Sequence, residues 1–203
     1  LGLEVKEGMP IPSLVAPRPP KLCDGCPHID SYTALNEAMK SFPGGRVFSD
    51  IGCYTLGALP PFQAIYSTVD MGASITMAKG ASEADLLPSV AVIGDSTFTH
   101  SGMTGLLDCC VDNANVTVII LDNGITGMTG SQKSSATGRI ESICTGLGVD
   151  PAHIRVINPL KKYFEENVAI MKEEIAYKGV SVIIPRRECI VALNKRLKAA
   201  KKA

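Results

Sequence analysis

Two short polar motifs each follow an apolar run that is long enough for one β-strand. Gly94-Asp95-Ser96 follows residues 90–93, and Asp122-Asn123-Gly124 follows residues 116–121. If both runs are parallel strands of one sheet, their carboxyl ends meet at one edge, where ligands bind in such sheets. Mg²⁺ prefers oxygen ligands and is usually held by one or two protein groups together with phosphate oxygens. The motifs therefore predict that Asp95, Asn123 and a loop carbonyl fix a magnesium ion against a diphosphate.

A simpler interpretation of Gly94-Asp95-Ser96 is a turn with a helix cap, because Asp and Ser are favoured in both. Two neighbouring segments favour a binding site instead. Residues 122–130 form a long, polar, Gly-rich stretch, and Asp70-Met71-Gly72 follows the preceding predicted strand. A helix that begins near Ser101 is expected to add N–H donors and the positive end of its dipole.

Four of the seven cysteines lie where strand ends or helix starts are expected. Cys23 and Cys26 form a Cys-x-x-Cys motif before the first predicted helix, Cys53 follows the first predicted strand, and Cys189 follows the last. Their thiols can converge at one sheet edge and suit either a [4Fe–4S] cluster or structural zinc. The Cys-x-x-Cys motif alone also suits a redox pair. The other cysteines lie in predicted helices, where burial as small hydrophobic residues is expected: Cys109, Cys110 and Cys144.

Short β-branched segments alternate with helical ones, which predicts an α/β fold with a mainly parallel sheet and helices on both faces. The predicted strands are residues 46–49, 64–69, 90–93, 116–121, 154–157 and 180–184. The predicted helices are residues 30–42, 72–81, 102–113, 139–147 and 160–178. We expect a Pro-rich linker over residues 1–20, one domain over 21–195 and a basic tail over 196–203, all within a larger protein.

The composition excludes several classes of protein. Lys and Arg together number 20, as do Asp and Glu, and no basic stripe is present, so nucleic acid is not an expected partner. No apolar run approaches the roughly 20 residues that span a bilayer, so no membrane partner is expected. An odd number of cysteines without a signal peptide predicts a reducing, cytoplasmic location.

Taken together, the motifs resemble the thiamine-diphosphate domain of the 2-oxoacid:ferredoxin oxidoreductase family, in its indolepyruvate branch and at the C-terminal end of its alpha subunit. The resemblance runs over residues 17–195. The segments that carry it are Cys23-Asp24-Gly25-Cys26-Pro27-His28, Asp50-Ile51-Gly52-Cys53-Tyr54, Asp70-Met71-Gly72, Gly94-Asp95-Ser96-Thr97-Phe98, Asp122-Asn123 and Met128-Thr129-Gly130.

This resemblance implies a role for each matching position. Asp95, Asn123 and the carbonyl of Ile125 would bind Mg²⁺. Thiamine diphosphate would contact Gly52, Tyr54, Asp70, Met71, Gly72, Gly94, Ser96 and Thr97, where Ser96 replaces the usual Gly. Met71 would wedge the cofactor into its bent shape, although it also suits a core position. The [4Fe–4S] ligands would be Cys23, Cys26, Cys53 and Cys189.

The resemblance also implies residues near the reacting atoms: His28, His100 and Thr129. His28 suits a loop hydrogen-bonding role equally well. The chain departs from the family pattern at Asp24, Ile29 and Glu188, where we expect Pro, Arg and Pro, and the first two departures bear on the identity of the substrate.

The implied activity is oxidative decarboxylation of 2-oxoacids, arylpyruvates such as indolepyruvate, to acyl-coenzyme A, with electrons passed to ferredoxin. It needs a separate pyrimidine-binding domain from another segment or a partner subunit. Two alternatives remain: a beta-type subunit of a pyruvate or other 2-oxoacid oxidoreductase, and a zinc-stabilised interaction module without catalysis.

Overall fold

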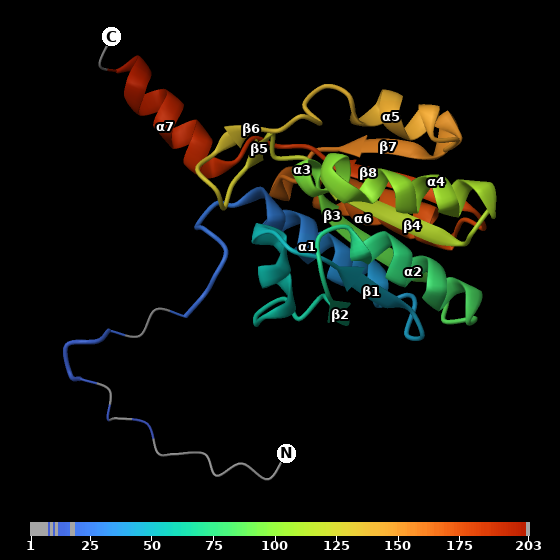
Figure 1. Ribbon diagram of the computed structural model, residues 1–203, viewed down its shortest axis with the longest axis horizontal. Coiled ribbons are helices and arrows are strands. Elements are labelled where there is room, and N and C mark those ends of the chain that lie inside the picture. The colour runs from blue at the N-terminus through green and yellow to red at the C-terminus, as the bar shows by residue number, and fades with distance from the viewer. Residues whose placement is uncertain (1–7, 9, 11, 17–18, 202–203) are drawn as a thin grey trace.

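Six parallel strands form one sheet through the middle of the molecule, in a computed structural model that describes residues 8, 10, 12–16 and 19–201 (Figure 1). The strand order is β2-β1-β3-β4-β8-β7. The strands are β1 (Arg46–Ser49), β2 (Ser67–Thr68), β3 (Ser89–Gly94), β4 (Val116–Leu121), β7 (Ile154–Ile157) and β8 (Val180–Pro185). The three central strands β3, β4 and β8 are buried along their whole length. Continuous apolar runs are typical of strands that are covered on both faces.

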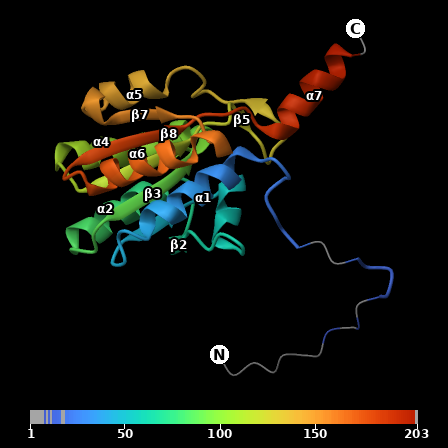
Figure 2. The same cartoon turned by 180° about the vertical axis from the view of Figure 1, so that it is seen from behind.

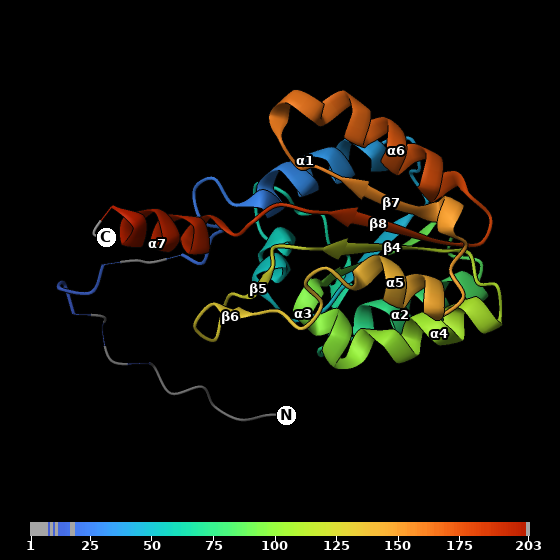
Figure 3. The same ribbon diagram turned by 90° about the horizontal axis from the view of Figure 1, so that it is seen from above.

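Helices cover both faces of the sheet, as Figure 3 shows from above. On one face lie α1 (Pro27–Met39) and α6 (Phe164–Ala176). On the other lie α2 (Ala73–Glu83), α4 (Met103–Val111) and α5 (Ile140–Gly146). The predicted α/β fold with a parallel sheet and helices on both faces is therefore confirmed.

The alternation of side chains along β3 divides the core into two halves. Ala91 and Ile93 belong to the cluster that includes the buried residues of α2, α4 and α5. Val90 and Val92 belong to the cluster that includes those of α1 and α6. Successive residues of a strand point to opposite faces, so a single strand anchors both helical layers.

The structure differs from the predicted elements in the loops at the carboxyl edge of the sheet. The strand predicted over 64–69 is only β2, and a 3-10 helix, η1 (Cys53–Ala58), follows β1. The helix expected to begin near Ser101 begins at Asp95, as α3 (Asp95–Thr97), and continues through a π-helical turn, η2 (Phe98–Gly102), into α4. Polar residues hide this start in the sequence, whereas the fully buried Phe98 anchors it in the core.

Further short elements were not predicted from the sequence: a hairpin and a 3-10 turn in expected loops, and a second 3-10 turn at the start of the helix predicted over residues 160–178. A small hairpin of β5 (Ile125–Thr126) and β6 (Gln132–Lys133) follows β4. Two 3-10 turns, η3 (Pro151–His153) and η4 (Lys161–Tyr163), precede β7 and α6.

The last helix, α7 (Ile190–Ala200), projects from the body of the molecule, as Figure 2 shows from behind. The predicted domain boundary at residue 195 falls inside this helix. Of the predicted linker, residues 1–7, 9, 11 and 17–18 lie outside the described part of the chain, as do residues 202–203 of the predicted tail. Within the described part, no helix has the length and apolar character needed to cross a membrane.

Candidate cofactor site

A cavity of about 210 Å³ opens at the carboxyl ends of β1, β3 and β4. It collects most of the residues that were predicted to bind cofactor or substrate, although they come from distant parts of the sequence. Those that line it are His28, Gly52, Tyr54, Met71, Gly94, Asp95, Ser96, Thr97, Asn123, Ile125 and Thr129. The parallel sheet brings them together because the ends of its strands share one edge.

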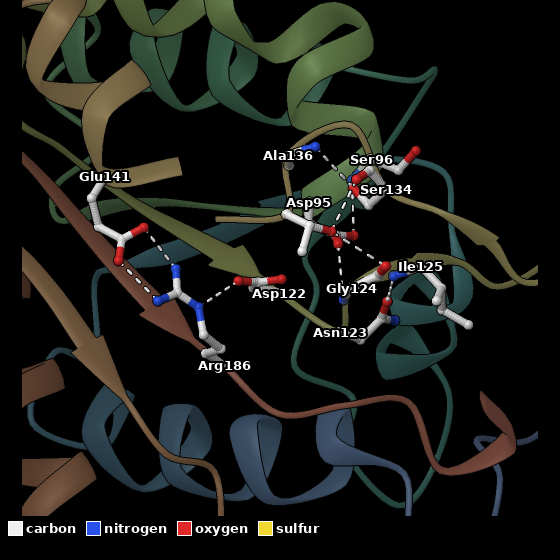
Figure 4. A network of polar contacts seen from close by, with 11 residues as sticks. Asp95, Ser96, Asp122, Asn123, Gly124, Ile125, Ser134, Ala136, Glu141 and Arg186 are labelled. Atoms are coloured by element: carbon white, nitrogen blue, oxygen red, sulfur yellow. Dashed lines mark hydrogen bonds and ion pairs between the residues drawn. The ribbon is translucent and has the colours of Figure 1, made fainter. Parts of the chain in front are cut away.

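Asp95 stands at the centre of a network that joins the ends of β3 and β4 (Figure 4). Its buried carboxylate accepts hydrogen bonds from the backbone N–H groups of Ser96, at 2.8 Å, and Gly124, at 3.0 Å. The amide oxygen of Asn123 accepts one from the Ile125 N–H at 3.0 Å. Both predicted magnesium-binding side chains are thus held in place by backbone donors, which leaves further oxygen lone pairs for a cation.

The electrostatics of Asp95 favour a cation at this position. Burial raises the pKa of its carboxyl group to about 6; the Ser96 N–H opposes the rise and the nearby Asp122 carboxylate adds to it. Asp122 pairs with Arg186 at 2.6 Å, and the same guanidinium binds Glu141 with two hydrogen bonds. None of the ion pairs within the described residues reaches Asp95. Oxygen donors beside an unbalanced buried acid fit Mg²⁺.

Asp50 is a buried acid at this edge that sequence reasoning did not select. Its carboxylate accepts hydrogen bonds from the Tyr54 hydroxyl, from the Ser74 hydroxyl at 2.6 Å and from the Gly72 N–H at 3.1 Å. Burial raises the pKa of Asp50, and these donors oppose the rise. It therefore links β1, η1 and the start of α2. The sequence signal was an Asp directly after a strand, but only the fold reveals that its side chain points inward.

Gly72 begins α2 in a conformation that favours glycine. Its φ is +95°, and a Cβ at this position would lie 2.5 Å from Oγ of Ser101. Gly72 itself does not line the cavity, whereas its neighbour Met71 does. Its role is to bring the α2 start close to η2.

His28 forms part of the cavity wall. It is almost completely buried, and burial lowers the pKa of its imidazole to about 4, so the ring is neutral at neutral pH. Its Nε2 lies 3.3 Å from the Asn123 amide nitrogen. Because that nitrogen can only donate, Nε2 is the acceptor and Nδ1 carries the ring proton. The ring also meets Tyr54 edge to face at 6.3 Å.

A second cavity of about 210 Å³ lies beside the first and is lined by Cys23, Cys26, Cys53 and Cys189. All the cysteines predicted to bind a cluster are therefore brought to one place. Burial raises the pKa of the Cys26 thiol to about 11, with smaller contributions from the nearness of the other three. Thiols that raise one another's pKa fit a cationic metal centre, since a coordinating metal holds them as thiolates.

Two kinds of metal centre use four cysteine ligands. Zinc requires four ligands around one ion, with sulfur at about 2.3 Å. No group of three or more His, Cys, Asp or Glu side chains within the described residues is close enough to hold a single ion. In a [4Fe–4S] cluster each thiolate binds a different iron. The [4Fe–4S] cluster and the zinc ion therefore both stay predictions for this cavity.

The comparison with known families is decisive for the fold and its cofactor class. Residues 50–184 match the family described as thiamine pyrophosphate enzyme, C-terminal TPP binding domain. The chain belongs to this family. The recognition of a thiamine-diphosphate-binding domain from the sequence motifs is thereby confirmed.

Relatives of this TPP-binding domain include the indolepyruvate oxidoreductase subunit IorA of two archaea. The protein of Archaeoglobus fulgidus is 35% identical over 92% of this chain and 31% of its own length. That of Pyrococcus abyssi is 36% identical over 95% of this chain and 32% of its own length. The chain thus spans about a third of the length of these curated relatives.

Two solved structures show the same fold as this TPP-binding domain. A 2-oxoglutarate:ferredoxin oxidoreductase from Magnetococcus marinus superposes with a TM-score of 0.69 at 18% identity, over 86% of this chain and 66% of that one. A putative thiamin diphosphate-dependent enzyme from Mycobacterium smegmatis gives a TM-score of 0.59 at 17% identity, over 78% of this chain and 31% of that one.

Besides Gly72, two predicted residues of the TPP-binding domain lie outside the lining of its cavity. Asp70 is exposed in the turn before α2, and His100 is exposed on η2. The roles predicted for them stay predictions that this geometry does not support. Met71 is 42% exposed and lines the cavity, so the alternative that it belongs to the core is wrong.

The mouth of the cavity is more apolar than the sequence motifs suggested. Ile51 and Met128 line it together with Met71 and are 46% and 73% exposed. Both residues follow strands in Gly-containing loops, and this placement was the sequence signal that could have identified them as cavity residues. Apolar side chains around the mouth suit a cofactor ring or an organic substrate.

The remaining cysteines of the TPP-binding domain have structural positions. Cys109 on α4 and Cys144 on α5 are completely buried in the core, and Cys110 packs against the same cluster. Burial raises the pKa of the Cys109 and Cys144 thiols to about 12. They behave as small hydrophobic residues, as the sequence predicted.

Proposed function

We propose that this chain is the thiamine-diphosphate- and [4Fe–4S]-binding part of an oxidoreductase that converts 2-oxoacids, in particular arylpyruvates such as indolepyruvate, to acyl-coenzyme A. Electrons pass to ferredoxin. The observation that carries this proposal is the shared wall of the two cavities. His28, Cys53 and Asn123 line both the predicted thiamine-diphosphate cavity and the cavity of the four cysteines.

The residues of the first cavity bind and orient the cofactor. Asp95 and Asn123 hold Mg²⁺ through side-chain oxygens, and Ile125 holds it through its carbonyl. The first turn of α3 lines the cavity through Ser96 and Thr97. The Ser96 N–H donates to Asp95, and the other N–H groups of a first helical turn, which lack helical partners, suit a diphosphate. When bound, thiamine diphosphate supplies the nucleophilic carbon for decarboxylation of the 2-oxoacid.

The side chains around the mouth separate the reacting atoms from water. Ile51, Met71 and Met128 provide apolar surface, and Met71 would support the bound cofactor. The neutral His28 imidazole fixes the Asn123 amide through Nε2. Its place between the cavities keeps a charged group out of the region that electrons cross.

The cysteine cavity gives the electrons a short exit. Cys53 lies closest to the reaction, because it lines both cavities, and Cys23 lies at the surface. A cluster on Cys23, Cys26, Cys53 and Cys189 would accept one electron at a time and pass it on to ferredoxin. Coenzyme A, a pyrimidine-binding domain or partner subunit, and a cytoplasmic location complete the proposal.

The test is a cofactor analysis of the full-length protein after anaerobic purification. We expect bound thiamine diphosphate and magnesium, iron and sulfide in equal amounts, and a brown colour. A colourless protein that contains zinc in place of iron would support the interaction module and refute this proposal. Comparing kcat/KM for indolepyruvate, pyruvate and 2-oxoglutarate then tests the substrate class, and a preference for pyruvate would favour the beta-type alternative.

A further inference from the structure

The segment that follows β8 forms a seam between the two cavities. Its backbone continues the sheet beside the end of β4: the Asp122 N–H donates to the Pro185 carbonyl at 3.0 Å, and the Arg187 N–H donates to the Asp122 carbonyl at 3.0 Å. The Cys189 N–H then donates to the Asn123 carbonyl at 3.2 Å. A predicted cluster ligand is thus bonded through its backbone to a predicted magnesium ligand.

Two adjacent arginines of this seam reach in different directions. Successive side chains of an extended segment point to opposite faces. Arg186 turns toward the magnesium edge, where its Nε donates to Asp122 at 2.6 Å and its other two nitrogens bind Glu141 at 2.8 and 2.7 Å (Figure 4). It thereby fixes the acid that lies beside Asn123.

Arg187 reaches to the side of the Cys-x-x-Cys turn and joins three segments. Its guanidinium pairs with Asp30 of α1 at 2.7 Å and donates to the Pro159 carbonyl at 2.7 Å and to the Gly25 carbonyl at 2.8 Å. Gly25 lies between Cys23 and Cys26, in a turn closed by a 2.9 Å hydrogen bond from the Cys26 N–H to the Cys23 carbonyl. Planar guanidinium groups suit such sets of fixed acceptors.

These contacts connect Arg187 to the segments that carry three of the four thiols. Cys23 and Cys26 move with Gly25, and Cys189 lies two residues beyond Arg187 in the same chain. The Arg187 and Asp30 side chains are 24% and 18% exposed, so solvent screens this pair less than a surface pair. Without the guanidinium, the Gly25 carbonyl loses the hydrogen bond that ties the turn to the seam.

We propose that Arg187 is the positioning residue of the four-cysteine site and that the neighbouring Arg186 positions the magnesium–diphosphate edge. One seam would then fix the position of the two cofactor sites relative to each other. This inference rests on the proposed function. It assigns to each arginine a different cofactor, whereas a general stabilising role would make both variants lose both cofactors together.

The experiment compares Arg187→Gln, Arg186→Gln and a matched control, Arg155→Gln, in the full-length protein purified anaerobically. Arg155 also pairs with acids, the buried Glu174 at 3.1 Å and Glu173 at 3.2 Å, but it lies on β7 and lines neither cavity. For each variant we would measure iron, sulfide, thiamine diphosphate, the spin-resonance signal of the reduced protein and the melting temperature.

We expect the iron and sulfide content of Arg187→Gln to fall roughly tenfold, which is the lower end of the effect of residues that orient metal ligands. Its thiamine diphosphate content should not change. Arg186→Gln should lose thiamine diphosphate and retain iron. Arg155→Gln should melt at a lower temperature and retain both. If Arg187→Gln fails to fold, Asp30→Asn weakens only one of the three contacts, because Asn keeps an acceptor oxygen but loses the charge. It should still alter the spin-resonance signal of the cluster.

Two results would overturn the inference. One is a full iron content with an unchanged signal in Arg187→Gln and Asp30→Asn. The other is a parallel loss of iron and thiamine diphosphate in both the Arg186 and Arg187 variants. Wild-type protein without iron would instead refute the proposed function, and this inference with it, so the two failures are distinguishable.

Discussion

Asp95 is the single charged side chain on which the proposed magnesium site depends. Replacing it with Ala removes a predicted magnesium ligand. Loss of a residue that only orients a metal ligand costs roughly 10- to 100-fold, and we expect retention of thiamine diphosphate to fall by at least that much. Asp95→Asn keeps the shape of the side chain and removes its charge, so retention of thiamine diphosphate should fall less in this variant. Asp85→Asn, an exposed position with a left-handed backbone that Asn accepts, is the control. Unchanged thiamine content in Asp95→Ala would contradict the assignment.

The cysteines fall into two sets, the predicted cluster ligands and the buried core cysteines, and substitutions can test this division. Cys53→Ala or Cys189→Ala should bleach the visible absorption and abolish the spin-resonance signal, because a [4Fe–4S] cluster needs all four thiolates. Cys109→Ala should leave both unchanged, since its thiol is buried in the core. Alanine is preferred to serine there because a buried hydroxyl without a partner would destabilise the fold. Loss of the cluster in Cys144→Ala with retention in Cys189→Ala would show that the fourth ligand is wrong.

At the scale of elements, the start of α2 depends on a glycine that no other residue replaces easily. Gly72 has a positive φ and lies against Ser101, so Gly72→Ala should lower the free energy of unfolding by about 1–3 kcal/mol. Gly80→Ala in the same helix has open space around it and should raise it by roughly 0.5–1 kcal/mol. Urea unfolding measures both. Equal effects of the two substitutions would exclude strain at Gly72 as the cause.

The irregular helix after β3 is the other element that shapes the site. The π-helical turn η2 lies between α3 and α4, and such turns are frequent at functional sites. With Phe98 buried in the core, this arrangement leaves Asp95 at the cavity and His100 exposed. The element therefore separates two residues that the sequence motif presented as one group.

At the scale of the whole molecule, the proposed function requires an active site that this chain shares with another segment or subunit. The chain spans about a third of the length of its archaeal relatives, and the proposed function assigns the pyrimidine-binding domain to another segment or a partner subunit. We expect no turnover of indolepyruvate by this chain alone, with coenzyme A and an electron acceptor present, and turnover by the full-length protein with its partners. Steady turnover by the purified chain alone would refute the shared site.

The sequence by itself determined the central strands and the chemistry of their ends. Short, mostly apolar, β-branched runs such as residues 116–121 and 180–184 predicted buried strands, because their length and composition are local properties. Since polar and cysteine residues followed those runs, a parallel sheet had to bring them to one edge. The cavity containing Asp95 and Asn123, and the gathering of the four cysteines, follow from that rule.

Only the tertiary structure decided which of these ends touch. β8 inserts between β4 and β7, and this order, which no local pattern encodes, brings Cys189 against Asn123. The inward direction of Asp50 and the exposure of Asp70 likewise depend on packing between distant segments. Local hydrogen bonding sets where an element begins and ends, whereas the neighbours of a side chain at a sheet edge are set by burial of surface from the whole chain.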